Sequence, residues 1–188
     1  MNLFGIKSKQ EMEEVEARAL ERVMDRLVRM YDEKHRFTAA DICEFHQNWL
    51  GEIYEWAGKY RQVNVSKDDF PFAAAVRVPA LMAEFEEAVL RRYTPCNFKD
   101  RAEVVRALAE VHTEFVLIHP FREGNGRVAR ILSTLMALQA GLPPLDFSLI
   151  AAEKKADYFT AVQMGMEKNY EPMEKIFAET IERSLAAS

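Results

Sequence analysis

Residues 119–130 read HPFREGNGRVAR, and this stretch holds several side chains that can do chemistry. His119 has the pKa range of a general base. Glu123 offers a carboxylate to a hard cation such as Mg²⁺, which commonly takes only one or two protein carboxylates. Arg127 and Arg130 are three residues apart, so they are neighbours on a helix, and their planar guanidinium groups suit phosphate oxygens. The stretch therefore predicts a site for a phosphorylated ligand.

Two glycines lie where a helix is expected to begin. Gly124 and Gly126 would let the backbone approach a ligand without obstruction by side chains. A helix N-terminus also presents unpaired N–H groups and a partial positive charge, which attract phosphate. Arginines at such a terminus oppose the helix dipole, at a cost of about 0.3–1 kcal/mol each. That placement makes sense if a polyanion binds between them.

Each of these features also has a simpler explanation. A lone G-x-G turn often only caps a helix, and a lone histidine is more often a hydrogen-bonded core residue than a base. Arg122 is expected to be solvated or to pack at the surface. A zinc site made of His112, His119 and Glu123 is a further alternative, but Pro120 disrupts the helical spacing between the last two. The whole string, rather than any one residue, favours a functional site.

The composition indicates one globular domain. The chain has 188 residues, of which 49% are apolar and 11% aromatic, so it can bury a sizeable core. Its net charge of −5 argues against general binding to nucleic acid or to membrane surfaces. The two cysteines, Cys43 and Cys96, are too few for a disulfide scaffold and fit a reducing cytoplasm. No apolar run resembles a signal peptide or reaches membrane-spanning length, so we expect a cytoplasmic protein.

The elements that position the stretch are expected to be mostly helices. Ser8 with Glu11 and Asp100 with Glu103 form capping-box patterns, and Pro120 ends the helix before it. Apolar residues at helical spacing then predict helices from Ser8, from Thr38 to Gly58, from Pro79, from Asp100 to Ile118, from about Gly126 to Gly141, and over about 147–168 and 172–186. The predicted fold class is all-α.

One segment departs from the helical period. In KYRQVNVSKDDFPF, Val63 and Val65 alternate with polar residues, and Phe70 and Phe72 repeat the alternation after the turn-like Lys67–Asp69. This pattern predicts a short β-hairpin. We expect the two valines to form its buried face.

The opening stretch resembles the signature of the Fic family, H-x-F-x-[DE]-G-N-G-R-x-x-R. Every fixed position is present, as His119, Phe121, Glu123, Gly124, Asn125, Gly126, Arg127 and Arg130. Further similarity lies in EWAGKYRQVNVSKDDFPF, which resembles the family's target-docking flap, and in NLFGIKSKQEMEEVEA, LPPLDF and ADYFTAV. The resemblance covers most of residues 2–170. It implies one Fic domain over 1–188, a helical bundle with a core at about 38–170, a flap at about 59–76 and a motif loop at 119–127.

The resemblance implies an enzyme that transfers AMP from ATP onto a Tyr, Thr or Ser hydroxyl of a target protein (AMPylation), with Mg²⁺ as cofactor. His119 would deprotonate the acceptor hydroxyl. Phe121 would anchor the loop in the core without taking part in the chemistry. Glu123 would ligate the Mg²⁺ that is bound to the α- and β-phosphates.

The rest of the motif is implied to bind the nucleotide. Gly124, Asn125 and Gly126 would form an anion hole, with the Asn125 side chain on the α-phosphate. Arg127 would meet the β-phosphate and Arg130 the γ-phosphate. This assignment agrees with the independent expectation of a phosphate site, because phosphoryl-type chemistry depends mainly on positioning and charge stabilisation.

The flap and the segment after the motif carry further expectations from the resemblance. In the family an extended target segment pairs with the flap edge and presents its hydroxyl to the histidine. Lys67 and Phe70 are therefore candidates for contact with the target or the nucleotide. The adenine pocket is expected near Tyr158 and Phe159, which are alternatively core residues.

Other activities remain open at this point. The related Doc toxins bind ATP in the reverse direction and transfer its γ-phosphate, although their motif departs from GNGR. Transfer of another nucleotide such as UMP is a second alternative. A catalytically idle interaction module is a third, and the presence of both His119 and Glu123 speaks against it.

Regulation is a separate expectation. Many Fic proteins are silenced by an inhibitory helix with the pattern [ST]-x-x-x-E-[GN], whose glutamate pairs with the second motif arginine, here Arg130. No Ser or Thr of this sequence is followed by Glu four positions later. We therefore expect inhibition in trans by a small antitoxin that supplies the helix, with this chain as the toxin. The alternative is an unregulated enzyme, or one controlled by expression or by a divergent inhibitory segment.

Overall fold

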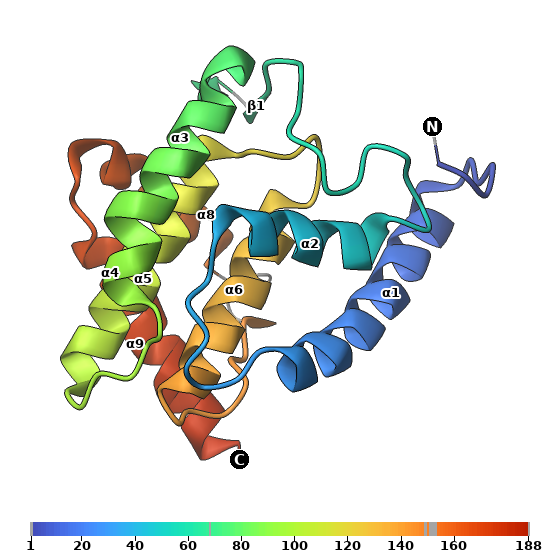
Figure 1. The fold of residues 1–188 in the computed structure, drawn as a ribbon. Helices are drawn as coiled ribbons and strands as arrows, with labels where there is room; N and C mark the ends of the chain where they lie inside the picture. Colours follow the sequence, from blue (N-terminus) through green and yellow to red (C-terminus); the bar gives the residue numbers. More distant parts are fainter. Residues whose placement is uncertain (1, 68, 149, 151–153, 188) are drawn as a thin grey trace.

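Helices α5 (Arg101–Ile118) and α6 (Asn125–Gln139) carry the motif loop between them in the computed structural model (Figure 1). The structure describes residues 2–67, 69–148, 150 and 154–187. The other elements are α1 (Lys9–Met30), α2 (Ala39–Leu50), β1 (Ser66–Lys67), β2 (Phe70–Pro71), η1 (Ala75–Arg77), α3 (Val78–Phe85), η2 (Glu86–Leu90), α4 (Arg91–Tyr93), α8 (Lys155–Met164), η3 (Gly165–Glu167) and α9 (Glu171–Ala186). The prediction of a mostly helical protein is confirmed.

The helices begin at the residues whose side chains can cap them. Ser8 accepts a hydrogen bond from the Glu11 N–H at the start of α1, and Asp100 accepts one from the Ala102 N–H at the start of α5. Thr38 and Asp41 form a reciprocal capping box at the start of α2. These contacts satisfy N–H groups that have no partner within their own helix.

The predicted end of α2 at Gly58 is wrong. The helix stops at Leu50, with Gly51 as its C-cap, and the N–H groups of Ile53 and Tyr54 turn back onto the Leu50 carbonyl. Glycine is a poor helix former, so the chain leaves the helix at the first of the two glycines. Gly58 instead adopts a positive φ of 73° in the following turn.

The core lies around α5 and α6, which pack against each other. α9 and α8 cover α5, whereas α2 and α1 contact α6. The predicted apolar stripe of α6 is buried over its length, as Val128, Ile131, Leu132, Leu135 and Met136. Burying one such side chain contributes roughly 1.5–3 kcal/mol, so the buried core stabilises the helices that flank the motif loop.

The hairpin exists but is shorter than predicted. Its strands pair antiparallel over two residues each, Ser66–Lys67 with Phe70–Pro71. The expectation that the valines form a buried face is wrong, because Val63 is 55% exposed and Val65 is only half-buried. The segment before β1 runs over the surface, where the core cannot cover it. Asp68, in the predicted turn, lies outside the described residues.

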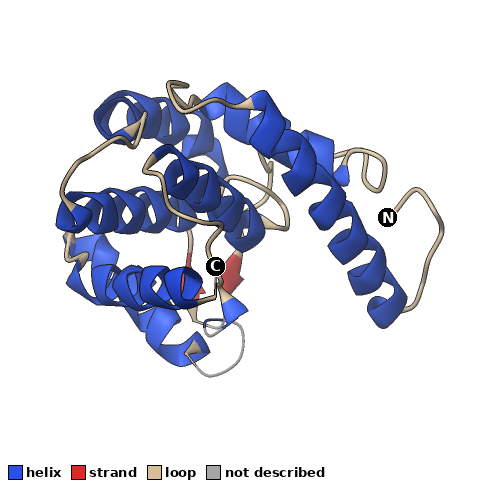
Figure 2. Cartoon of the chain, turned by 90° about the horizontal axis from the view of Figure 1, so that it is seen from below, coloured by secondary structure: helices blue, strands red, loops and turns tan. Residues whose placement is uncertain are grey.

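The C-terminal helices agree with the prediction in part. α9 (Glu171–Ala186) matches the predicted 172–186, whereas α8 begins at Lys155 and a 3-10 turn follows it at Gly165. Of the helix predicted over 147–168, residues 149 and 151–153 lie outside the described part. Figure 2 shows the hairpin in red beside helices and loops. Among the described helices, none is both long and apolar enough to cross a membrane.

Candidate active site

The motif loop begins and ends in left-handed backbone. His119 is the C-cap of α5 with φ 52° and ψ 58°, a conformation that is uncommon for a residue with a side chain. Gly124 is the N-cap of α6 with φ 82°, and a Cβ there would lie 2.7 Å from Cζ3 of Trp49. Conformation and packing therefore both require glycine at 124. A Cβ at Gly126 would meet no heavy atom within 4 Å, so that glycine borders open space.

Two buried side chains fasten the loop backbone. The Asn125 amide accepts from the Phe121 N–H at 2.8 Å and donates to the Phe121 carbonyl at 2.9 Å. His46 accepts from the Gly58 N–H at 2.8 Å, so its other ring nitrogen donates to the Glu123 carbonyl at 3.1 Å. Phe121 is fully buried and stacks on His46 at 4.0 Å, which confirms its predicted role as an anchor. These contacts, all within the protein, fix the shape of the loop.

These contacts do not support the role predicted for the Asn125 side chain. Both ends of its amide bond to the backbone of Phe121, and the residue is only 2% exposed. The side chain therefore fixes the shape of the loop. The first N–H groups of α6 have no acceptor within the helix, so they can bind an anion.

The His119 ring has the form of a general base. Its Nδ1 lies 3.1 Å from the Val116 carbonyl, which can only accept, so Nδ1 carries the proton and Nε2 keeps a lone pair. Phe72 of the flap stacks on the ring at 3.7 Å. Burial lowers the pKa of His119 to about 4; the bond to Val116 opposes this, and Arg61 and Lys67 reinforce it. The ring is therefore neutral at pH 7.

Arg127 is engaged by α1. Its guanidinium lies 2.6 Å from the Glu16 carboxylate and 3.6 Å from that of Glu123, and it covers the Trp49 ring at 4.4 Å. The buried Glu16 also accepts from the Tyr54 hydroxyl at 2.7 Å. Arg127 thus ties the first turn of α6 to α1, and its charge is partly balanced within the protein.

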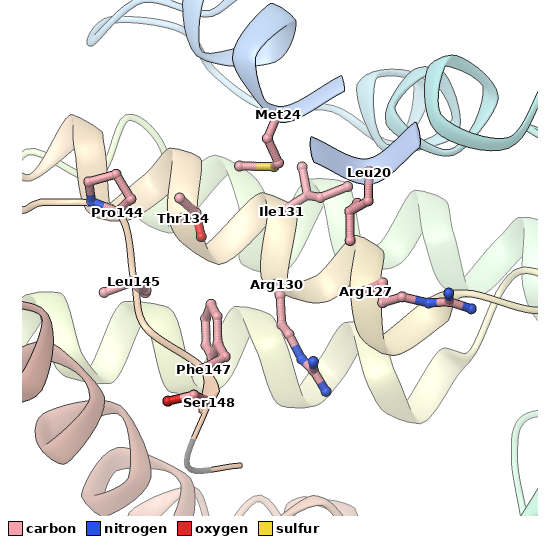
Figure 3. A pocket seen from close by; sticks show the side chains of 10 residues that line it. All are labelled: Leu20, Met24, Arg127, Arg130, Ile131, Thr134, Pro144, Leu145, Phe147 and Ser148. Carbon is pink, nitrogen blue, oxygen red and sulfur yellow. The ribbon is translucent and has the colours of Figure 1, made fainter. Parts of the chain in front are cut away.

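Arg130 is less engaged. Its Nε is buried and finds no hydrogen-bond partner among the described residues. A buried donor without a partner costs about 1–3 kcal/mol, so this nitrogen points to a ligand. The guanidinium borders two cavities, one polar and one apolar. Figure 3 shows Arg127 and Arg130 extending from the first turns of α6.

The polar cavity has a volume of about 840 Å³ and collects most of the predicted phosphate and metal ligands. On the α6 side its walls are Glu123, Gly124, Gly126, Arg127 and Arg130. On the other side they are Tyr54 and residues of the N-terminal segment and α1: Ile6, Lys7, Ser8, Lys9, Met12, Glu13 and Glu16. The cavity therefore combines cationic side chains, a helix N-terminus and an accessible carboxylate.

A second group of predicted residues meets at the flap. Phe70 contacts Phe72 and Phe159 edge to face, at 5.4 and 5.7 Å between ring centroids. Nζ of Lys67 lies 4.6 Å from the centroid of the Phe159 ring. Because Phe72 stacks on His119, the flap connects Phe159 to the candidate base.

Tyr158 belongs to a buried chain of hydrogen bonds. The Ser133 hydroxyl donates to the Ala129 carbonyl at 2.9 Å, so it accepts from Nδ1 of His112 at 3.1 Å. Nε2 of His112 then accepts from the Tyr158 hydroxyl at 2.8 Å. Burial, with a contribution from Arg130, lowers the pKa of His112 to about 3, which keeps the ring neutral.

The zinc alternative finds no support. Both ring nitrogens of His112 are hydrogen-bonded to hydroxyl groups, and Nδ1 of His119 is bonded to a carbonyl. Within the described ranges no three His, Cys, Asp or Glu side chains gather as metal ligands would.

Sequence reasoning missed three residues that support the site. Glu16 and His46 fall on the apolar stripes of their helices, at positions where a polar residue must be paired, and that signal was present in the sequence. Arg61, which is 3% exposed, gave no such signal, because it lies in a loop that precedes the hairpin. Its partners became visible only in the structure.

Comparison with known proteins gives a consistent result. The model of the Fic/DOC family matches residues 36–137. Protein adenylyltransferase fic-1 of Caenorhabditis briggsae is 28% identical over 154 residues, which is 81% of this chain and 29% of that protein. Protein adenylyltransferase VbhT of Bartonella schoenbuchensis is 30% identical over 145 residues, 74% of this chain and 29% of that protein. The chain thus spans under a third of the length of these two relatives.

Solved structures share the fold. The N-terminal Fic domain of a VirB-translocated Bep effector protein from Bartonella quintana, with bound ADP, has a TM-score of 0.76 and 27% identity over 96% of this chain and 89% of that chain. BepC from Bartonella tribocorum, with bound AMPPNP, has a TM-score of 0.75 at 23% identity, over 96% and 90% of the two chains.

Proposed function

Because this chain belongs to the Fic/DOC family, we propose that it transfers AMP from Mg·ATP onto a hydroxyl side chain of a target protein. The observation that carries the proposal is the polar cavity, where a fastened glycine turn brings Glu123, Arg127 and Arg130 together. The names of the relatives, protein adenylyltransferases, support the same reaction. Tyr, Thr and Ser are the candidate acceptors.

The proposed chemistry is in-line displacement at the α-phosphorus. Nε2 of His119 accepts the proton of the acceptor hydroxyl as its oxygen bonds to phosphorus. The bond from the α-phosphorus to the bridging oxygen breaks, and pyrophosphate leaves. The N–H groups at the start of α6, with Gly126 leaving space for the ligand, stabilise the charge on the α-phosphate oxygens.

The donor set suits a Mg²⁺ ion that arrives with the phosphates. Glu123 borders the polar cavity, and its side chain is 65% exposed, so a cation can reach its carboxylate. One carboxylate with phosphate oxygens and waters is a usual Mg²⁺ site. When bound, the ion neutralises part of the phosphate charge.

The two arginines are proposed to share the outer phosphates unequally. Arg127 already pairs with Glu16, and this carboxylate balances part of its positive charge. Its attraction for a phosphate is correspondingly weaker. Arg130 has a buried nitrogen without a partner in the described structure, so it is the stronger candidate for the γ-phosphate. Arg127 remains the candidate for the β-phosphate.

At the flap we propose that the target segment pairs with the edge of the hairpin. Lys67 and Phe70 would contact the target or the nucleotide, and Phe159 would lie against the adenine base. Tyr158, whose hydroxyl is hydrogen-bonded to His112, would support that pocket from the protein interior.

Labelled nucleotides test the reaction. Incubation with cell lysate should transfer label to protein from α-labelled ATP and not from γ-labelled ATP, because the AMP moiety moves and pyrophosphate leaves. Labelled UTP in a parallel reaction tests the nucleotide. If protein gained label from γ-labelled ATP, the reaction would be phosphotransfer and not AMP transfer. If protein gained no label from any nucleotide, the result would favour an interaction module.

The proposal includes inhibition by a helix that another polypeptide supplies. An apolar cavity of about 470 Å³ lies between Leu20 and Met24 of α1 and Ile131 and Thr134 of α6 (Figure 3). Arg130 borders it. An amphipathic helix bound at this cavity could place a glutamate beside Arg130. The given sequence contains no copy of the inhibitory pattern [ST]-x-x-x-E-[GN]. This chain would then act as a toxin and its partner as an antitoxin.

Growth measurements test the toxin role. Expression of this chain alone in bacteria should slow growth, and His119→Ala should remove the defect, because transfer causes it. Purification from the native host should recover a small protein bound to the chain. Equal growth with and without His119, together with no bound small protein, would contradict the pairing.

A further inference from the structure

We propose that Arg61 is a positioning residue that holds the flap and His119 together as one unit. The inference deepens the proposed function, since it names a residue that aligns the base with the target-docking flap. It rests on the hydrogen bonds of a single buried guanidinium group.

Arg61 binds three consecutive carbonyls where α5 ends. Its Nε donates to the His119 carbonyl at 2.7 Å, and one terminal nitrogen donates to the Ile118 carbonyl at 3.3 Å. Its backbone N–H donates to the Pro120 carbonyl at 2.9 Å. The last carbonyls of a helix have no partner within it and favour a cation nearby. Arg61 therefore caps α5 at the residue that carries the candidate base.

The same side chain binds both ends of the flap. One terminal nitrogen donates to the Val63 carbonyl at 2.8 Å, before β1, and the other donates to the Ala73 carbonyl, after β2. Ala73 follows Phe72, whose ring stacks on His119. Arg61 thus holds the His119 backbone directly, through the His119 carbonyl. It also holds the His119 ring indirectly, because it binds the flap segment that carries Phe72.

Arginine suits this position for a physical reason. The residue is 3% exposed, and the described residues offer it no ion pair, so carbonyl oxygens alone compensate the buried charge. A guanidinium presents five N–H donors in a rigid fork, whereas an ammonium offers three from a single point. Lysine would keep the charge but could not reach both the flap and the turn.

Hydrogen exchange of the unmodified protein gives the first test. If Arg61 joins the two parts, the amides of Phe72 and Arg61 should open with the same free energy and denaturant dependence as those of His119 and Phe121. Flap amides that open separately from the motif loop would overturn the proposal. This measurement needs no enzymatic activity, so it stands apart from the proposed function.

Variants give the second test. Arg61→Lys and Arg61→Met should both release the flap and the His119 turn together. They should lower kcat for transfer by about 10²-fold, because small misplacements of a reacting group cost that much. The Kd of Mg·ATP should stay near that of the wild type. Arg77, an exposed arginine after the flap, supplies matched controls in Arg77→Lys and Arg77→Met.

A different pattern would show a purely structural role. A folded Arg61→Lys protein with a lower Tm, an unchanged kcat and an unchanged exchange pattern would overturn the proposal. If Arg61→Met does not fold, Arg61→Lys and the exchange of the wild type still decide the question.

Discussion

Replacing His119 by alanine should lower the rate of AMP transfer by about 10²–10⁴-fold, the usual contribution of a general base. The affinity for Mg·ATP should change little, because Nε2 faces the acceptor hydroxyl in the proposed reaction and the phosphates lie at α6. Transfer is measured with α-labelled ATP and binding by calorimetry. His35→Ala is a matched control, since that ring pairs with Asp41 at the start of α2. A His119→Ala protein that incorporates label at the wild-type rate would remove the base assignment.

The pH dependence sharpens this prediction. A base acts only when it is neutral, and burial lowers the pKa of His119 to about 4. The ring therefore stays unprotonated as the pH falls through 6.5, where an ordinary histidine would gain a proton. We expect kcat/KM to hold between pH 7 and pH 5.5 and its acidic limb to lie below that range. An acidic limb centred near pH 6.5 would show that the ring is solvated when the enzyme works.

Local sequence signals predicted the helices that flank the site. Ser8, Thr38 and Asp100 cap the helices that they were expected to cap, because a capping contact joins residues two or three positions apart. The left-handed conformation of Gly124 was not predicted, because its glycine was interpreted only as giving a ligand access to the backbone. Two of the failures have a local cause. At the end of α2, two glycines competed as stop signals, and the alternation of the flap valines gave no information about what would cover them.

The contacts that shape the motif loop could not be predicted in this way. His46 binds the carbonyl of a residue 77 positions away, and Glu16 pairs with an arginine 111 positions away. No periodicity encodes such partners, because they follow from how α1 and α2 pack on α6. The apolar stripes show that a polar residue there needs a partner, and only the packed structure shows which one.

The family resemblance likewise assigned roles without regard to these contacts. It placed Arg127 and Arg130 on successive phosphates, yet one is paired with Glu16 and the other has a buried nitrogen without a partner in the described structure. It placed the Asn125 amide on a phosphate, yet that amide holds the backbone of Phe121. The motif identifies the residues of the site, and the contacts that surrounding helices make with each side chain determine which of them can bind a ligand.

Arg130 therefore gives the second large effect. Arg130→Met should raise the thermal stability of the nucleotide-free protein, because it removes a buried donor without a partner, which costs about 1–3 kcal/mol. Methionine can fill the same space against the apolar cavity, where Leu20, Ile131 and Phe147 lie. If Arg130 stabilised the protein by packing, Arg130→Met would instead lower the thermal stability.

The same variant should lose the response to nucleotide. A ligand present at 100 times its Kd stabilises a protein by about 2.7 kcal/mol, and this gain should largely vanish when the guanidinium that meets the γ-phosphate is absent. Thermal unfolding with and without Mg·ATP measures both effects on one sample. Arg122→Met is the matched control, because Arg122 is an exposed arginine of the same loop and should leave both values unchanged. An Arg130→Met protein that is less stable without nucleotide and still responds fully to Mg·ATP would make Arg130 a structural residue and leave the γ-phosphate without a partner.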